Sequence, residues 1–255
     1  MKLAHRLKSA GHAALWHLFG VVFVMVATSV FVFGLWFPYP YAELASGYRL
    51  VSMIAGIEVV CGPLLTAVLF SRSKPQVELW RDLGLVALIQ VAALAYGLFT
   101  IWHARPLFLA QETDRFKVVI LADIAPDALD ALPAVLKPGW LSGPIVVALR
   151  EPIDSKERNK VLLESVQGGR DYAERPEFYL PYEGAAAMKS LQRAKPLVGF
   201  LQKKPDQQDA ARKLALKKGA DIAQWLYLPV IAREDWVAVL DKQGQIQGFL
   251  EGDGF

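Results

Sequence analysis

Three long apolar stretches constrain this chain more than any other feature of its sequence. Residues 13–37 and 83–102 contain no Asp, Glu, Lys or Arg, and residues 50–70 contain one acid, Glu58. About 20 residues at 1.5 Å rise cross a hydrocarbon core roughly 30 Å thick, and each stretch is long enough. The alternative, buried helices of a soluble protein, would need polar faces that these stretches lack. The sequence therefore predicts three transmembrane helices.

The first stretch could instead be a cleaved signal peptide, because a basic leader with Lys2, Arg6 and Lys8 precedes it. Its apolar core is longer than that of a signal peptide, however, and it ends in the aromatic run WFPYPY at residues 36–41 rather than in small residues. Aromatic rings of this kind favour the boundary between membrane and water. We expect an uncleaved anchor.

Lys and Arg counts in the short flanks predict the orientation. The N-terminal tail holds three, the first loop one (Arg49) and the second loop three, which places the tail and the second loop in the cytoplasm. Residues 1–12 are then a basic cytoplasmic tail, 13–104 a three-helix transmembrane domain, and 105–255 a domain on the other side of the membrane.

Charge separates the two parts of the chain. Residues 1–104 hold 7 basic and 4 acidic residues, whereas residues 105–255 hold 21 of each. The net charge of +3 therefore reflects membrane topology and not a nucleic-acid-binding surface. Basic residues at 203–204, 212–213 and 217–218 are interpreted as solvated helix surface, the alternative being a patch for lipid headgroups or an acidic partner.

Residues 105–255 predict an α+β fold. Short apolar runs flanked by turn residues indicate strands, and charged amphipathic stretches indicate helices. The predicted strands are 116–121, 144–149 and 225–232 with a hairpin around Lys242-Gln243-Gly244; the predicted helices are 155–166, 184–194 and 206–218, the last capped by Gly219; and 175–181 is predicted as a loop.

The residue types in this domain restrict its chemistry. All four histidines precede residue 105, and the one cysteine, Cys61, lies inside a predicted span. A Ser-His-Asp triad, a Cys-His pair, a His/Cys zinc site and intrachain disulfides are thus ruled out there. Ser-Lys or paired-carboxylate chemistry stays open, but nothing marks a catalytic set, and Gly168-Gly169-Arg170 lacks the context of a phosphate loop. We expect no cofactor.

Glu58 is the candidate functional residue of the membrane part. Counted at 1.5 Å per residue from Leu50, it lies about 12 Å inside the span, where an unpaired carboxylate is costly and suggests a site. Ala55, Glu58, Gly62 and Thr66 form a stripe of small and polar residues on one helix face, which would let another helix approach. Pro63 removes a backbone donor and predicts a kink beside Glu58.

Three roles for Glu58 stay open. Thr28, Ser29 and Tyr96 fall at its depth and could bond it within the chain, whereas Gln90 lies about 8 Å deeper and is the weaker candidate. An internal structural acid and a site for a partner's helix are weighted equally. Proton transport ranks last because no second titratable group is predicted at that depth.

Ordered motifs carry a resemblance to a known family. LWFPYPYAELASG, IEVVCGPLLTAVLF and the stretch from Trp80 to Val119 resemble successive blocks of the TfpX/TfpZ family of type IV pilin accessory proteins. The resemblance covers Leu35–Val119, about a third of the chain. Its motifs are Pro38-Tyr39-Pro40, Gly62-Pro63-Leu64-Leu65, Arg105-Pro106 and Asp114-Arg115-Phe116.

The resemblance implies a non-enzymatic, multi-pass protein of the bacterial inner membrane with a periplasmic C-terminal domain, acting as accessory or chaperone for its cognate type IV major pilin. The expected partners are that pilin, membrane lipids and other pilus assembly components. The expected partner-binding residues are Ala55, Glu58, Gly62, Pro63 and Thr66, with Arg105, Asp114 and Arg115 as a charged collar where the third helix enters the domain. The alternatives are a pilin-modifying transferase and a sensor or scaffold of the cell envelope.

Overall fold

A computed structural model describes residues 2–255, which divide into two compact units. The chain through Gly34, together with Gly47–His103, forms a helical unit. Leu35–Ser46 and Ala104–Phe255 form the second unit, an α+β domain. This domain is therefore discontinuous in sequence, which the sequence alone does not predict.

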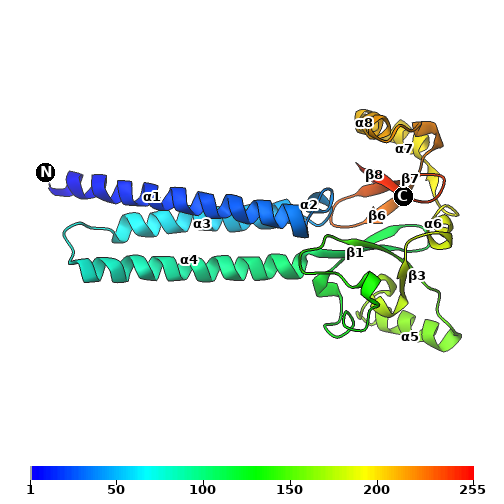
Figure 1. The fold of residues 1–255 in the computed structure, drawn as a ribbon, viewed down its shortest axis with the longest axis horizontal. Helices are drawn as coiled ribbons and strands as arrows, with labels where there is room; N and C mark the ends of the chain where they lie inside the picture. Colours follow the sequence, from blue (N-terminus) through cyan, green and yellow to red (C-terminus); the bar gives the residue numbers. More distant parts are fainter. Residues whose placement is uncertain (1) are drawn as a thin grey trace. The chain divides into compact units, whose positions relative to one another are not determined.

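Three long helices make up the helical unit (Figure 1). They are α1 (Lys2–Phe31), which continues as the π-helix Val32–Trp36, α3 (Gly47–Leu69) and α4 (Gln76–Ala104). Within the described residues, Leu7–Trp36, Gly47–Leu69 and Gln76–Ala104 are long and apolar enough to cross a membrane, with mean hydropathies of 2.5, 1.9 and 2.0. The predicted number of spans is confirmed.

The outward faces of these helices are apolar. Large side chains such as Trp16, Phe23, Val60 and Leu88 are exposed. Water would penalise so much contiguous apolar surface, whereas lipid does not. The helical unit is therefore that of a membrane protein.

Helix α4 begins before its predicted span, and its first turns make polar contacts with the residue just before it. In the first turns of α4, Lys74 Nζ lies 2.5 Å from Asp82 Oδ2 and 3.5 Å from Glu78 Oε1. These pairs let the helix begin at Gln76, before the apolar stretch that starts at Leu83. The apolar stretch 83–102 is the part of α4 that lipid can cover, and the helix itself is longer than this stretch.

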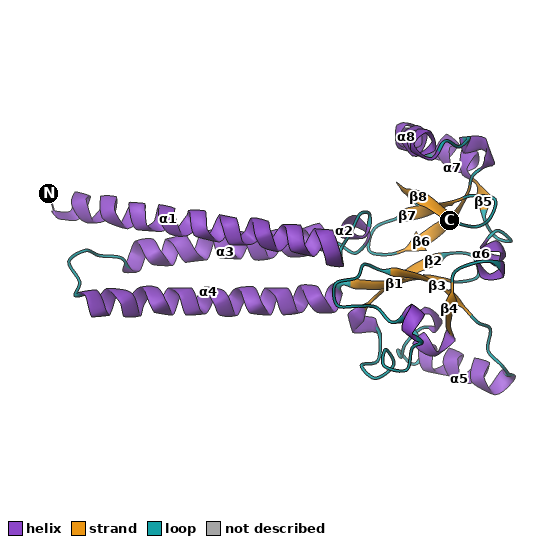
Figure 2. Ribbon diagram, in the orientation of Figure 1, coloured by secondary structure: helices purple, strands orange, loops and turns teal. Residues whose placement is uncertain are grey.

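The α+β domain is built on a sheet with the strand order β4-β3-β1-β2-β6-β7-β8 (Figure 2). Strand β1 pairs in parallel with β3 and antiparallel with β2, which pairs in parallel with β6. The strands are β1 (Pro106–Gln111), β2 (Phe116–Ile120), β3 (Ile145–Leu149), β4 (Tyr179–Pro181), β5 (Lys195–Pro196), β6 (Leu226–Ile231), β7 (Trp236–Leu240) and β8 (Ile246–Glu251). The helices are α2 (Tyr41–Leu44), α5 (Ser155–Val166), α6 (Ala185–Ser190), α7 (Leu197–Lys203) and α8 (Gln208–Lys218).

Both faces of the sheet are covered. Alternate residues of one strand point to opposite faces, so Leu109 of β1 packs with α2, while Phe108 packs with Leu132 and with Tyr179 at the start of β4. Helices α7 and α8 cover strands β6, β7 and β8 on the face opposite α2, through residues such as Phe200. Central strands buried on both sides read as continuous apolar runs, as the sequence of β1 and β3 does.

Segment Leu35–Ser46 belongs to this core. Phe37 and Leu44 are fully buried, and Tyr41 packs at 6.1 Å between ring centroids against Phe249. Leu44 O accepts a hydrogen bond of 3.0 Å from Arg233 N. The loop between the first two long helices is thus a structural part of the α+β domain.

The predicted fold class, three membrane helices followed by an α+β domain, is confirmed. Helix α5 and the hairpin turn at Gly244, with φ of 77°, match their predictions, and Gly219 caps α8 with φ of 63°. Strand β1 was missed because only Arg105 separates it from α4. The loop prediction for 175–181 is wrong, since a 3₁₀ turn at Pro176–Phe178 leads into β4.

Candidate functional site

One face of α3 points inward in the helical unit. Its buried residues recur three or four positions apart, which is one side of a helix: Val51, Ile54, Glu58, Gly62 and Thr66. Ala55 and Pro63 lie beside this inner face and are partly exposed, and Cys61 is exposed. Helix α3 continues unbroken through Pro63.

Glu58 is 5% exposed and only partly hydrogen-bonded. The Nε2 of Gln90 on α4 donates to Glu58 Oε2 at 3.2 Å and lies 3.4 Å from its main-chain oxygen. Within the described part of the chain, Glu58 Oε1 is buried without a hydrogen-bond partner. Such an atom retains an unused acceptor, and leaving it unused is energetically costly.

The preference for Thr28, Ser29 or Tyr96 as the partner of Glu58 is wrong, because the structure places Gln90 there. Ser29 Oγ bonds its own helix at Met25 O over 2.7 Å, and the Tyr96 side chain is exposed. The depth count failed because α3 starts at Gly47 and not Leu50, while α4 ends at Ala104. From these ends Glu58 and Gln90 differ by three residues, about 4.5 Å, which a glutamine side chain can span.

Gly62 makes room for this contact. A Cβ at Gly62 would overlap the carboxamide of Gln90. The small residue predicted to admit another helix therefore admits a side chain of α4. Within the stripe, Glu58 and Gly62 therefore face Gln90 of α4.

The inner face of α3 has a second polar contact one turn or more beyond Gly62. His17 Nδ1 of α1 lies 2.5 Å from Thr66 Oγ1. Thus α1 and α4 each supply one polar side chain to α3. His17 was not predicted as a site residue, because a single histidine on an apolar helix has no spacing that marks its partner.

A cavity of about 310 Å³ lies among the three helices. His17, Glu58 and Gln90 are its polar lining residues, and the rest is apolar side chains within residues 20–25 of α1 and 87–94 of α4. Among the described residues no group of three or more His, Cys, Asp or Glu is placed to hold a metal ion. The cavity therefore has a largely apolar wall, and Glu58, whose Oε1 is buried and unbonded, lies at its edge.

Arg105, the first predicted collar residue, is buried in the α+β domain and hydrogen-bonds to the main chain of the loop before β3. It is 4% exposed, and its Nη1 donates to Trp140 O at 3.0 Å and lies 3.4 Å from Gly139 O. Trp36 Nε1 donates to the same Trp140 oxygen at 2.9 Å. Burial lowers the pKa of Arg105 to about 10.

Asp114 and Arg115 lie at the other end of the β1–β2 hairpin, so the structure does not bring the three collar residues together. Arg115 Nε donates to Asp114 Oδ1 at 2.7 Å, and this bond lowers the pKa of Asp114. The Arg115 guanidinium also lies 4.9 Å from the centroid of the Phe255 ring. These two residues sit on the wall of a polar cleft of about 620 Å³. Sequence reasoning missed the cleft because distant segments form it.

Comparisons with known proteins point to one kind of protein. A family model described as "Fimbrial assembly protein FimB" matches residues 5–46, which include most of α1 and all of α2. "Fimbrial assembly protein, serogroup I" of Dichelobacter nodosus is 32% identical over 228 residues, covering 88% of each chain. The serogroup E1 protein of the same organism is 31% identical over 236 residues, covering 91% of each chain. A third relative, of serogroups C1 and C2, is 37% identical over 98 residues, which are 38% of this chain and 75% of the relative. No solved structure matches the chain.

Proposed function

Since the chain belongs to the family of fimbrial assembly proteins, we propose that it is a TfpX/TfpZ-type accessory protein that assists the stability and assembly of type IV pilin. The relatives are named for assembly and not for a reaction. Residues 105–255 also contain no histidine or cysteine that could serve as a catalytic base or nucleophile. Both observations support a non-enzymatic role.

In this proposal the protein resides in the bacterial inner membrane with its N-terminus in the cytoplasm and the α+β domain in the periplasm. The charge bias of the flanks supports this orientation, with three basic residues in the second loop and one in the first. A pilin before assembly would present both an apolar helix in the membrane and a globular part outside it. A protein with one unit in the membrane and another outside it could contact both the helix and the globular part of the pilin.

The observation that carries the proposal is the incomplete bonding of Glu58 beside an apolar cavity. A three-helix unit that needed Glu58 only for its own packing would be expected to satisfy both carboxylate oxygens. A pilin helix passing along this face would bury its apolar side chains in the cavity and donate to Glu58 Oε1. Ala55, Gly62, Pro63 and Thr66 would shape the same face.

The primary experiment is deletion of the gene in its own host. Surface pili, the amount of the major pilin and its intact mass are measured together. Few pili with pilin of unchanged mass are expected. A shifted pilin mass would indicate a modifying transferase, and normal pili with normal pilin levels would favour an envelope sensor or scaffold.

Direct contact is tested by photo-crosslinking from the membrane face. A photoreactive amino acid replacing Val91, on the cavity wall, should capture the pilin, whereas the same replacement at Leu88, an exposed position of α4, is the matched control. Equal capture from both positions would contradict a specific role of the cavity face.

A further inference from the structure

The polar cleft of about 620 Å³ lies at one edge of the sheet in the α+β domain. Strands β1 and β3 are parallel neighbours, and both end at this cleft, at Gln111 and Leu149. Loops that leave parallel strands at their carboxyl ends diverge and open a space, which is where ligands commonly bind in such sheets. The cleft is therefore placed where the topology favours a binding site.

Its lining carries a surplus of positive charge. Five basic side chains face three acidic ones: Arg115, Arg150, Arg158, Lys189 and Arg193 against Glu112, Asp114 and Glu151. The remaining wall mixes amides with apolar groups, including Pro152 and Tyr172. A cleft of this charge favours a ligand with a few negative charges, and the three acids on its wall oppose a strongly polyanionic one.

Two of the five basic residues are not held by a hydrogen bond or an ion pair among the described residues. Arg115 pairs with Asp114, Arg150 with Glu157 through bonds of 2.8 and 2.9 Å, and Lys189 with Glu151 at 2.7 Å. Arg158 and Arg193 are exposed, and in the described part of the chain each guanidinium has only a longer-range attraction, Arg158 to Glu151 and Arg193 to Asp114. Arg158 comes from α5 and Arg193 from the segment after α6. Two guanidinium groups with unused N–H donors therefore line one cleft.

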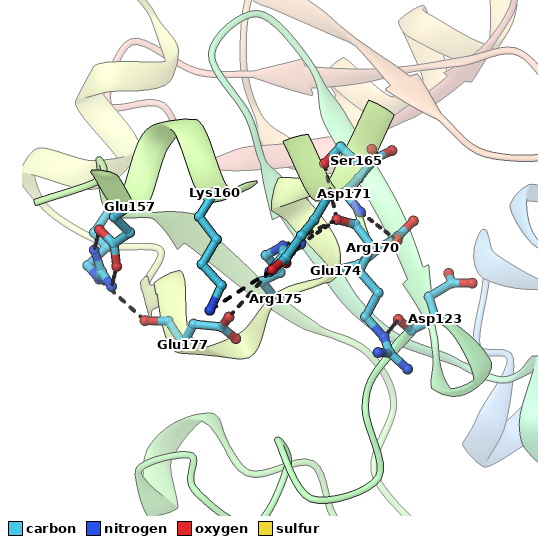
Figure 3. Close-up of polar contacts among 11 residues, drawn as sticks. Asp123, Glu157, Lys160, Ser165, Arg170, Asp171, Glu174, Arg175 and Glu177 are labelled. Carbon is cyan, nitrogen blue, oxygen red and sulfur yellow. Dashed lines mark hydrogen bonds and ion pairs between the residues drawn. The ribbon is translucent and has the colours of Figure 1, made fainter. Parts of the chain in front are cut away.

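Helix α5, which carries Arg158, is held by polar contacts to the segment around Arg170 and Arg175 (Figure 3). Arg175 Nη2 bonds Glu164 of α5 at 2.7 Å and Arg170 O at 3.0 Å, and Ser165 Oγ bonds the same Arg170 oxygen at 3.1 Å. Arg170 Nε in turn donates to Asp123 O at 2.8 Å. Helix α5 is thereby tied to the loops behind it, which reduces the ordering cost when a ligand binds Arg158.

We propose that this cleft binds an acidic peptide segment of a partner protein, with carboxylates held by Arg158 and Arg193. Guanidinium groups bind carboxylates through paired hydrogen bonds, and the apolar wall at Pro152 and Tyr172 accommodates the peptide's carbon atoms. The inference rests on the proposed function, in which the partner is the extracytoplasmic part of a pilin.

The test uses the full chain in detergent micelles and a fluorescent peptide that carries two glutamates in an otherwise neutral sequence, with binding followed by anisotropy. The double variant Arg158→Ala/Arg193→Ala should bind the peptide about tenfold more weakly, because it loses the hydrogen bonds between the two guanidinium groups and the peptide's carboxylates. The matched control, Arg212→Ala/Lys213→Ala on the exposed side of α8, should bind like the parent protein. Equal losses in both double variants would show nonspecific charge attraction and overturn the inference.

Two further measurements complete the test. Inorganic phosphate should compete only at millimolar concentrations. Competition as strong as that of the unlabelled two-glutamate peptide would mean a small-anion site and contradict a peptide site. Thermal unfolding of both double variants should match the parent, since all four side chains are exposed. Peptide binding is measured on the purified protein and does not depend on pili. Normal pili in the deletion strain would therefore reject the proposed function, whereas only the binding measurements decide whether the cleft binds an acidic peptide.

Discussion

At the scale of single residues, Glu58 separates structural from functional roles. Glu58→Gln keeps a side chain of the same length that can still bond Gln90, so stability should change by less than about 1 kcal/mol, as for other hydrogen bonds between membrane helices. If the carboxylate binds the pilin, surface pili should nevertheless fall severalfold. Pilus counts and the unfolding midpoint in detergent measure the two effects. Full piliation by Glu58→Gln would assign Glu58 to internal packing.

Gly62 offers a test of packing with an internal control. Gly62→Leu should destabilise the helical unit by about 1–3 kcal/mol, because its side chain must displace Gln90 from Glu58. A Cβ at Gly56, six residues earlier in α3, meets no atom within 4 Å, so Gly56→Leu should be nearly neutral. The unfolding midpoint in detergent compares the two. Equal effects would contradict the contact between Gly62 and Gln90.

At the scale of elements, the start of α5 predicts a dependence of stability on pH. Bonds from Arg150 and then from Ile153 N lower the pKa of Glu157 from 4.5 to about 2. Because the folded-state pKa is lowered, the stabilisation is complete above about pH 4.5 and is lost as the pH falls toward 2. Thermal unfolding between these values should show a steeper loss in the parent than in Glu157→Gln. Glu183→Gln, at a side chain without a hydrogen bond or ion pair among the described residues, is the control.

Helix α2 should behave as a core element although it has only four residues. Leu44→Ala removes a fully buried side chain from the α+β domain and should cost about 2–5 kcal/mol. Glu43→Ala, one residue earlier and partly exposed, should cost much less. Resistance of the domain to protease reports the difference. Equal resistance of both variants would mean that α2 is not part of the folded core.

The elements also show how far sequence reasoning reaches. The amphipathic spacing of apolar residues predicted α5 and α8, and Gly219 predicted the end of α8. Alternating apolar and polar residues on either side of Gly244 predicted the last hairpin. Strand β1 carries no such boundary because it is buried on both faces and follows α4 almost directly. The stripe on α3 predicted an inner face, but the identity of its partners, Gln90 and His17, depends on helix ends and rotation that periodicity does not determine.

At the scale of the whole molecule, orientation is the property to test. In a Cys61→Ser background, Gln243→Cys at the last hairpin should react with a membrane-impermeant maleimide in intact spheroplasts. Arg72→Cys, in the loop between α3 and α4, should react only after lysis, because the proposed orientation places that loop in the cytoplasm. Gel-shift labelling gives the answer for each site. The opposite pattern would invert the proposed topology.

The discontinuity of the α+β domain has a consequence for the order of biosynthesis. Leu35–Ser46 leaves the ribosome before Gly47–His103, and the strands that bury Phe37 and Leu44 follow only afterwards. The domain core therefore cannot close until the intervening helical hairpin has been synthesised. If the orientation is as proposed, a chain in which only one of α3 and α4 crosses the membrane keeps its strands on the wrong side, and Phe37 and Leu44 stay open to proteases. The shared core thus links completion of the domain to correct insertion of the hairpin.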